Sequence, residues 1–134
     1  DAIIRSNRVT RWVEVLTVYL DQAWARDIWS YATPNEKHAP ALAFTPGMDA
    51  AFAHTFRLEV EKKLTHDGYA EIASMYGGPG YLVVSLQMPF LSQSTIDAMR
   101  NEWKTIQDVG KPIFRSIYLV YPSMNQYRAT RWSP

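Results

Sequence analysis

Apolar residues recur at every third or fourth position near the start of the chain. Residues 6–31 contain neither Gly nor Pro, and the apolar residues that follow this spacing are Val9, Trp12, Val13, Leu16, Leu20, Ala23, Trp24 and Ile28. This spacing predicts an amphipathic helix, with Ser6 or Asn7 as its N-cap. The same segment is rich in β-branched residues, so a strand is the alternative. The length of the unbroken run favours the helix.

The next pattern predicts a strand, a helix and a second strand. Residues 41–44 form a short apolar run, and residues 49–66 follow with helical spacing. The apolar face of that helix would consist of Phe52, Ala53, Phe56, Val60 and Leu64. Gly68 stands where a left-handed residue often ends a helix, and residues 69–73 are interpreted as the following strand.

The second half of the chain has clearer boundaries. Residues 77–80, with the sequence Gly-Gly-Pro-Gly, predict a loop, and residues 81–88 predict a strand that Pro89 ends. Residues 94–97 resemble a capping box with Asp in the Glu position, which predicts a third helix. Residues 113–121 and 126–132 predict two strands joined by a hairpin turn over residues 122–125.

This order of elements indicates the fold class. Helix, strand, helix, strand, strand, helix, strand and strand predict a single α+β domain spanning residues 1–134. We expect a small, mostly antiparallel sheet with about three helices packed on one face. The length of 134 residues suits one domain. Because the chain starts with Asp1 and not Met, it is interpreted as a processed chain or a soluble fragment of a longer one.

Composition and charge exclude several classes of protein. Apolar residues make up 47% of the chain and charged residues 20%, which is typical of a globular protein. The net charge of +1 gives no argument for a polyanionic partner. The absence of cysteine excludes disulfides, thiolate metal sites and cysteine nucleophiles. No apolar stretch approaches the length of a membrane span, so we expect membrane contact only through a segment outside this sequence.

The remaining motifs provide little support for catalysis. His38, His54 and His66 lack the spacing of metal ligands. The Gly77–Gly80 loop precedes a predicted strand and lacks the lysine of a phosphate-binding loop. There is no Gly-x-Ser-x-Gly elbow. We therefore expect no metal, no cofactor and, on balance, no enzymatic activity.

Surplus aromatic residues point to a surface that binds other proteins. Five Trp and eight Tyr exceed what a domain of this size can bury, and both residue types are enriched at interfaces. We expect an oligomer or a complex subunit with other proteins as partners. The candidate partner-binding residues are Trp29, Tyr31, Tyr76, Tyr81, Tyr118, Tyr127 and Trp132.

Two alternatives come from other classes of function. The first is a cone-shaped α+β domain in which a long N-terminal helix crosses a curved sheet and encloses a pocket for a small molecule or a reaction. That pocket would be lined by Trp12, Tyr19, Trp24, His54 and Trp103, with Tyr118 as a further wall, and Asp21, Asp27 or His54 as acid or base. The second is single-stranded nucleic-acid binding through the basic and aromatic residues 127–132. Residues 80–134 carry only six basic and three acidic side chains, so an edge strand with protective charges is the favoured interpretation.

One stretch resembles a known group of proteins. Residues 41–46 (Ala-Leu-Ala-Phe-Thr-Pro), the helix over residues 52–64 and then His66-Asp67-Gly68-Tyr69 are similar to small bacterial envelope lipoproteins, including the conjugal TrbH-like group. Those proteins help to assemble secretion or conjugation machines. The resemblance covers about half of the chain. It implies a non-catalytic scaffold that is periplasmic or associated with the outer membrane, with a cytoplasmic location left open. Such families carry a lipid-bearing cysteine that this sequence lacks, which implies its removal with the N-terminus.

Overall fold

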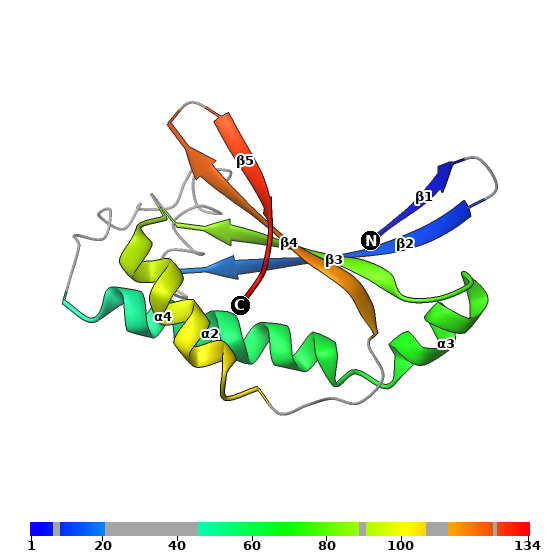
Figure 1. Ribbon diagram of the computed structural model, residues 1–134, viewed down its shortest axis with the longest axis horizontal. Coiled ribbons are helices and arrows are strands. Elements are labelled where there is room, and N and C mark those ends of the chain that lie inside the picture. Colours follow the sequence, from blue (N-terminus) through cyan, green and yellow to red (C-terminus); the bar gives the residue numbers. More distant parts are fainter. Residues whose placement is uncertain (7–8, 21–45, 89–90, 107–112, 125) are drawn as a thin grey trace, which may run out of the picture.

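One five-stranded sheet organises the protein, and its helices lie on one side of it (Figure 1). The computed structural model describes residues 1–6, 9–20, 46–88, 91–106, 113–124 and 126–134. The strands are β1 (Ala2–Ser6), β2 (Val9–Tyr19), β3 (Gly80–Gln87), β4 (Phe114–Ser123) and β5 (Gln126–Arg131). The helices are α2 (Met48–Leu64), α3 (Gly68–Met75) and α4 (Gln93–Trp103). The prediction of a single-domain α+β fold is confirmed.

The strands are arranged in the order β1-β2-β3-β4-β5, which is also their order along the chain. The central pairs β2–β3 and β3–β4 are parallel, and the outer pairs β1–β2 and β4–β5 are antiparallel. The prediction of a mostly antiparallel sheet is therefore wrong at its centre. Parallel neighbours need a crossover connection, and here α2 and α3 lie between β2 and β3 along the chain, while α4 lies between β3 and β4.

The N-terminal segment corrects the first prediction. Over Val9–Tyr19 the chain is the strand β2 and not a helix. Trp12, Val13 and Glu14 are buried in succession in β2, which lies between β1 and β3 inside the sheet. From Glu14 onward the burial alternates as in a strand, but the acidic residue at the buried position 14 and the valines at positions 13 and 15 hide this two-residue period in the sequence. The rest of the predicted helix, residues 21–31, and the predicted strand over residues 41–44 lie outside the described residues.

The segment after α2 is a second correction. Residues 69–73 belong to the helix α3 and not to a strand. Ala70, Glu71 and Ala73 favour helix, and they outweigh the single β-branched residue of the segment, Ile72. Gly68 is the first residue of α3, so it does not end α2 in a left-handed conformation.

The other predicted elements are confirmed with small shifts in their ends. The helix predicted over residues 49–66 is α2, and the strand predicted over residues 81–88 is β3. Helix α4 begins after Ser92, whose hydroxyl accepts a hydrogen bond from the Thr95 amide, so Ser92 and not Ser94 is the N-cap. The closing hairpin is β4–β5, and Met124 in its turn has a positive φ of 54°.

The core lies between the sheet and helices α2 and α4 (Figure 1). Phe52, Phe56 and Val60 of α2 are fully buried. They pack with Leu82, Val84 and Leu86 of β3, with Leu119 of β4 and with Met99 of α4. Both edge hairpins rise away from the helices at opposite ends of the sheet (Figure 1).

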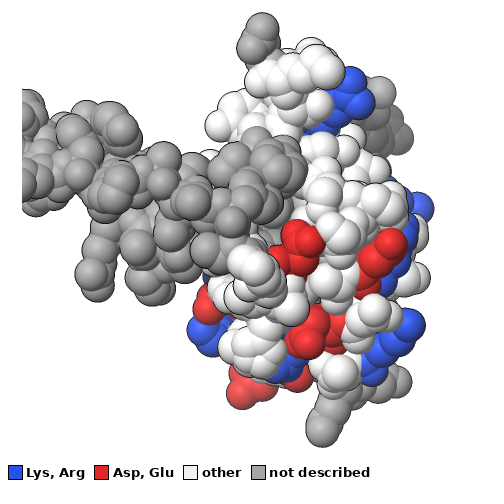
Figure 2. Space-filling model, turned by 90° about the vertical axis from the view of Figure 1, so that its left-hand side faces the viewer, with Lys and Arg blue, Asp and Glu red and all other residues white. Residues whose placement is uncertain are grey.

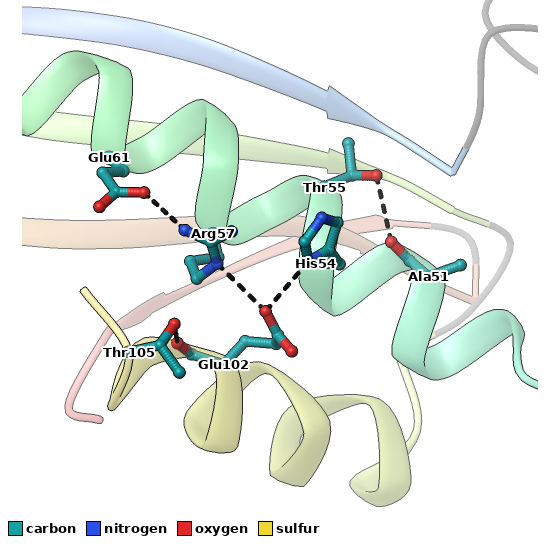
Figure 3. Close-up of polar contacts among 7 residues, drawn as sticks. All are labelled: Ala51, His54, Thr55, Arg57, Glu61, Glu102 and Thr105. Carbon is teal, nitrogen blue, oxygen red and sulfur yellow. Dashed lines mark hydrogen bonds and ion pairs between the residues drawn. The ribbon is translucent and has the colours of Figure 1, made fainter.

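Polar contacts fix α4 against α2 at the surface (Figure 3). Glu102 Oε2 accepts a hydrogen bond from Arg57 Nε at 3.1 Å and lies 3.3 Å from His54 Nδ1. Arg57 also pairs with Glu61 on its own helix, at 2.5 Å. Partly exposed pairs near a surface each stabilise a fold by only about 0–1 kcal/mol. Their contribution here is to orient the two helices, and they place His54 on the helical surface.

Candidate functional site

Charge is divided unevenly between the sheet and the helices. On the described strands the charged residues that reach solvent are all arginines: Arg5, Arg11, Arg115, Arg128 and Arg131. The described helices carry the acidic residues Asp49, Glu59, Glu61, Glu71, Asp97 and Glu102, mixed with lysine and arginine. Seen from one end, the helical half shows charges of both signs, whereas the hairpin above it shows basic groups among uncharged ones (Figure 2). The exposed charge on the described strands is therefore positive, which favours an acidic partner.

The one acid on the described strands, Glu14, is buried on the helix-facing side of β2. Its exposed fraction is 6%. Lys63 of α2 donates a hydrogen bond to Glu14 Oε1, and the Tyr69 hydroxyl supplies another. Burial by itself would raise the pKa of Glu14, but these two hydrogen bonds and the lysine charge outweigh it, so the pKa lies below its ordinary value of 4.5. Glu14 is therefore ionised and neutralised inside the fold.

The two partners of Glu14 respond in the expected direction. The hydrogen bond to Glu14 raises the pKa of Lys63 above its ordinary value of 10.5, against the opposing effect of burial. Burial, followed by the hydrogen bond to Glu14, raises the pKa of Tyr69 above 10.0. All three groups therefore hold their usual neutral-pH charge states, which is typical of a structural ion pair and not of an acid–base catalyst.

An aromatic cluster beside this ion pair holds the β1–β2 hairpin to α3. The ring of Trp12 stacks on Tyr69 at 5.4 Å and meets Phe114 of β4 at 5.2 Å. Trp12 Nε1 donates a hydrogen bond to the Gly78 carbonyl at 3.1 Å. A Cβ on Gly80 would lie 2.4 Å from the Trp12 ring. The packing therefore requires glycine at position 80, because the Trp12 indole occupies the space that any side chain there would need.

A groove opens between this hairpin and α3, and we call it the hairpin groove. One part has a volume of about 480 Å³ and is lined mainly by apolar side chains, including Ala2, Ile3 and Ile72, with Glu14 also in its wall. The adjoining part has about 450 Å³ and is more polar, with Arg5, Thr10 and Arg11 in its wall. Met75 and Tyr76 line both parts. The groove thus presents an apolar section beside a cationic one.

The strand above the groove is unusually open. Every residue of β1 is exposed, and β1 has only β2 as a neighbour among the described strands. Ile3, Ile4, Val9 and Val15 are between 45% and 52% exposed, and all four belong to β1 and β2. Edge strands of soluble proteins are commonly protected by charges, proline or a bulge. Within β1 only Arg5 offers such protection.

The predicted partner-binding residues have different surroundings. Tyr76 lines the hairpin groove, and Tyr127 is 66% exposed on β5. Tyr81 and Tyr118 are half-buried, their rings 6.1 Å apart. Trp132 is buried and packs edge-on against Phe56, at 5.6 Å, and against Trp103, at 5.8 Å. The remaining two, Trp29 and Tyr31, lie outside the described residues.

The described residues of the predicted alternative pocket do not lie together. Trp12 belongs to the cluster with Tyr69 and Phe114, whereas Trp103 belongs to the cluster with Phe56 and Trp132. His54 is on the surface with Glu102, and Tyr19 ends β2. Trp24, Asp21 and Asp27 lie outside the described residues. The long N-terminal helix on which this alternative depended is a strand over Val9–Tyr19.

Sequence reasoning missed the hairpin groove and the buried ion pair. One signal was available, since Glu14 interrupts an otherwise apolar run from Trp12 to Leu16. A charge at that place in a strand predicts a buried partner. The sequence does not say which lysine supplies it.

Comparison with protein-family models, curated proteins and solved structures finds no match for this chain. The resemblance to envelope lipoproteins thus stays a prediction. Among the described helices none has the length and apolar character to cross a bilayer. The same part of the chain brings together no group of three or more side chains suited to a metal ion.

Proposed function

We propose that this domain binds other proteins by taking up an extended segment of a partner along the outer edge of β1. The observation that carries the proposal is the exposed, apolar β1 edge directly beside the hairpin groove. An added strand would complete the backbone hydrogen bonds of β1, and its side chains would alternate between the two faces.

The register of the hairpin specifies the partner's chemistry. Ile3 is opposite Trp12 and Arg5 is opposite Thr10, so Ile3 and Arg5 share the helix-facing side of the sheet. A partner strand would place one side chain beside Ile3 and the next on that face beside Arg5. The first position favours an apolar side chain that enters the groove. The second favours Asp or Glu, because its carboxylate would pair with Arg5.

A scaffold role in a bacterial envelope assembly belongs to the same proposal. Binding by strand addition requires no reacting group, in agreement with a non-enzymatic interaction domain. A periplasmic or outer-membrane-associated location is supported by the sequence resemblance alone.

A displayed library of random peptides, selected on the immobilised domain, tests this proposal. We expect enrichment of peptides with an apolar and an acidic residue two positions apart. Arg5→Glu should change the selected acidic position to Lys or Arg. Ile3→Lys should weaken the best peptide at least tenfold, which is about 1.4 kcal/mol.

Leu58→Lys is the matched control, because Leu58 is 38% exposed on α2, away from the groove. It should leave peptide affinity unchanged. Selection of no common pattern, or equal losses with both lysine variants, would contradict the proposal. Self-association that Ile3→Lys abolishes would assign the edge to a second copy of the chain instead. Tighter binding of a single-stranded oligonucleotide at this edge would assign it to nucleic acid.

A further inference from the structure

We infer a second binding site, at the opposite end of the sheet, for a carboxylate joined to a short apolar chain. The site is a cavity of about 200 Å³ between α4 and the end of the β4–β5 hairpin. It shares no lining residue with the hairpin groove, so it is independent of the proposed function.

The floor of this cavity is apolar and small. Leu91, Ile96 and Leu119 contribute its aliphatic surface. Pockets for drug-sized ligands measure roughly 300–1,000 Å³. The smaller volume here suits a chain of a few carbon atoms or one aliphatic side chain.

The rim of the cavity is cationic. Arg100 of α4 and Arg131 of β5 line it, together with the hydroxyl residues Thr130 and Ser133. Its lining within the described part of the chain includes no Asp or Glu. Arg100 pairs with Asp97 at 3.3 Å through Nη1, but both side chains are exposed, and the guanidinium keeps further donors. Positive charge contributed by two elements around the cavity favours an anionic group, and a carboxylate suits the hydrogen-bond donors of a guanidinium.

An unsatisfied donor in the cavity wall is the second observation. Trp132 is 8% exposed, and its Nε1 is the one buried side-chain nitrogen or oxygen in the described residues without a hydrogen-bond partner. Buried polar groups in folded proteins nearly always have a partner, so this one requires a physical reason. A carboxylate drawn in by Arg131 would supply the missing acceptor.

For the indole to reach that acceptor the wall around Trp132 must shift, because Nε1 is buried. Pairing between β4 and β5 ends at Arg131, and the Trp132 amide is held by the Ile117 carbonyl at 2.9 Å. Ser133 follows this last contact and also lines the cavity. A shift of Ser133 would leave the pairing of β4 with β5 intact.

Titration of the isotope-labelled domain with hexanoate, followed by NMR, tests the inference. We expect saturable shifts of the Trp132 indole N–H and of the Leu119 and Thr130 amides. Hexanol, with the same tail and no charge, should bind at least tenfold more weakly. Arg131→Gln and Arg100→Gln should each weaken hexanoate about tenfold, equivalent to about 1.4 kcal/mol.

Arg128→Gln is the matched control, since Arg128 is an exposed arginine of the same strand that is not part of the cavity lining. It should leave hexanoate affinity unchanged. An absence of saturable shifts, equal binding of hexanol, or equal losses with Arg128→Gln and Arg131→Gln would overturn the inference. Acetyl-Gly-Leu with a free carboxylate distinguishes the two sources of such a ligand, a protein C-terminus and a free short-chain acid. Tighter binding than hexanoate assigns the site to a protein C-terminus, and weaker binding assigns it to a free short-chain acid.

Discussion

The two edge hairpins have the same topology and opposite surfaces. In the β1–β2 hairpin the outer strand exposes Ile3 and Ile4, whereas in the β4–β5 hairpin it exposes Tyr127, Arg128 and Arg131. Charged side chains on an edge strand discourage the addition of another strand. Of these two described edges the N-terminal one is the better suited to strand addition, because β5 carries two arginines and β1 carries one.

Each hairpin is also held to the core by one tryptophan, and the two differ in their hydrogen bonds. Trp12 donates to the Gly78 carbonyl, whereas Trp132 Nε1 has no partner in the described part of the protein. The indole N–H of Trp12 is thus satisfied, whereas the indole N–H of Trp132 remains available to a ligand.

The largest expected effect on stability comes from removing the Trp12 side chain. Trp12→Ala should lower the free energy of unfolding by about 3–5 kcal/mol, because a large buried aromatic side chain is lost. Urea-induced unfolding measures the loss, and hydrogen exchange should show faster exchange of β1 amides than of β5 amides. Equal acceleration of amide exchange in both hairpins would show that Trp12 does not stabilise the β1–β2 hairpin specifically.

Breaking the buried ion pair should have the next largest effect. Lys63→Met leaves the Glu14 carboxylate without its cation and should cost about 1–3 kcal/mol at about pH 7, a range reduced from the fully buried case because Lys63 is partly exposed. Urea unfolding of Lys63→Met against the parent protein measures this cost. A loss no larger than that of Lys62→Met, an exposed neighbour, would contradict the interpretation.

The same ion pair predicts a dependence of stability on pH. Because the folded pKa of Glu14 is lower than its ordinary value of 4.5, its contribution is fully present above that value. It is lost as the pH falls through the lower, folded pKa. Glu14→Gln should therefore flatten the acid limb of a plot of stability against pH. An unchanged acid limb would show that other carboxylates produce it.

Filling the space over Trp12 is expected to have a similar cost. Gly80→Ala places a Cβ against the indole and should destabilise the fold by about 1–3 kcal/mol through overpacking. In a Trp12→Leu background the same substitution should cost less, because the clashing ring is absent. Urea unfolding of the parent protein, the two single variants and the double variant gives the coupling energy between positions 12 and 80. A coupling energy near zero would refute the close contact.

The smallest expected effect compares the two indole N–H groups directly. Trp12→Phe removes a hydrogen bond and leaves the Gly78 carbonyl without this donor, whereas Trp132→Phe removes a donor that has no partner. The first substitution should cost about 1 kcal/mol more than the second. Thermal unfolding of the pair measures the difference, and the reverse order would sharply weaken the case for a ligand near Trp132.

Much of the fold could be predicted where local patterns agree with burial. Phe52, Phe56 and Val60 lie on one face of a helix, and Leu82, Val84 and Leu86 alternate along a strand. The pattern failed at β2 because Val13 and Glu14 are both buried, although they point to opposite faces of the sheet. Burial of Glu14 depends on Lys63, which is 49 residues away in the sequence. The spacing of residues along the chain does not identify tertiary partners of this kind.

The candidate sites were less predictable than the fold, because each one joins separate elements. Tyr76 was expected at a surface and does line the hairpin groove, but the groove also needs β1 and β2 as its opposite wall. Trp132 was expected at a partner surface, yet its ring completes the core. A count of aromatic residues suggests that a surface exists, and only the packing of hairpins against helices determines where it is.

A sheet whose spatial order equals its chain order has a consequence for how the protein is made. Each strand is added beside the one that precedes it, so no later strand has to insert between two that are already paired. During synthesis from the N-terminus the growing sheet therefore always has its next pairing edge free. The β4–β5 hairpin is the last addition, and its local turn closes it rapidly. Burial of Trp132 would then mark the end of folding and lock the final strand to the core.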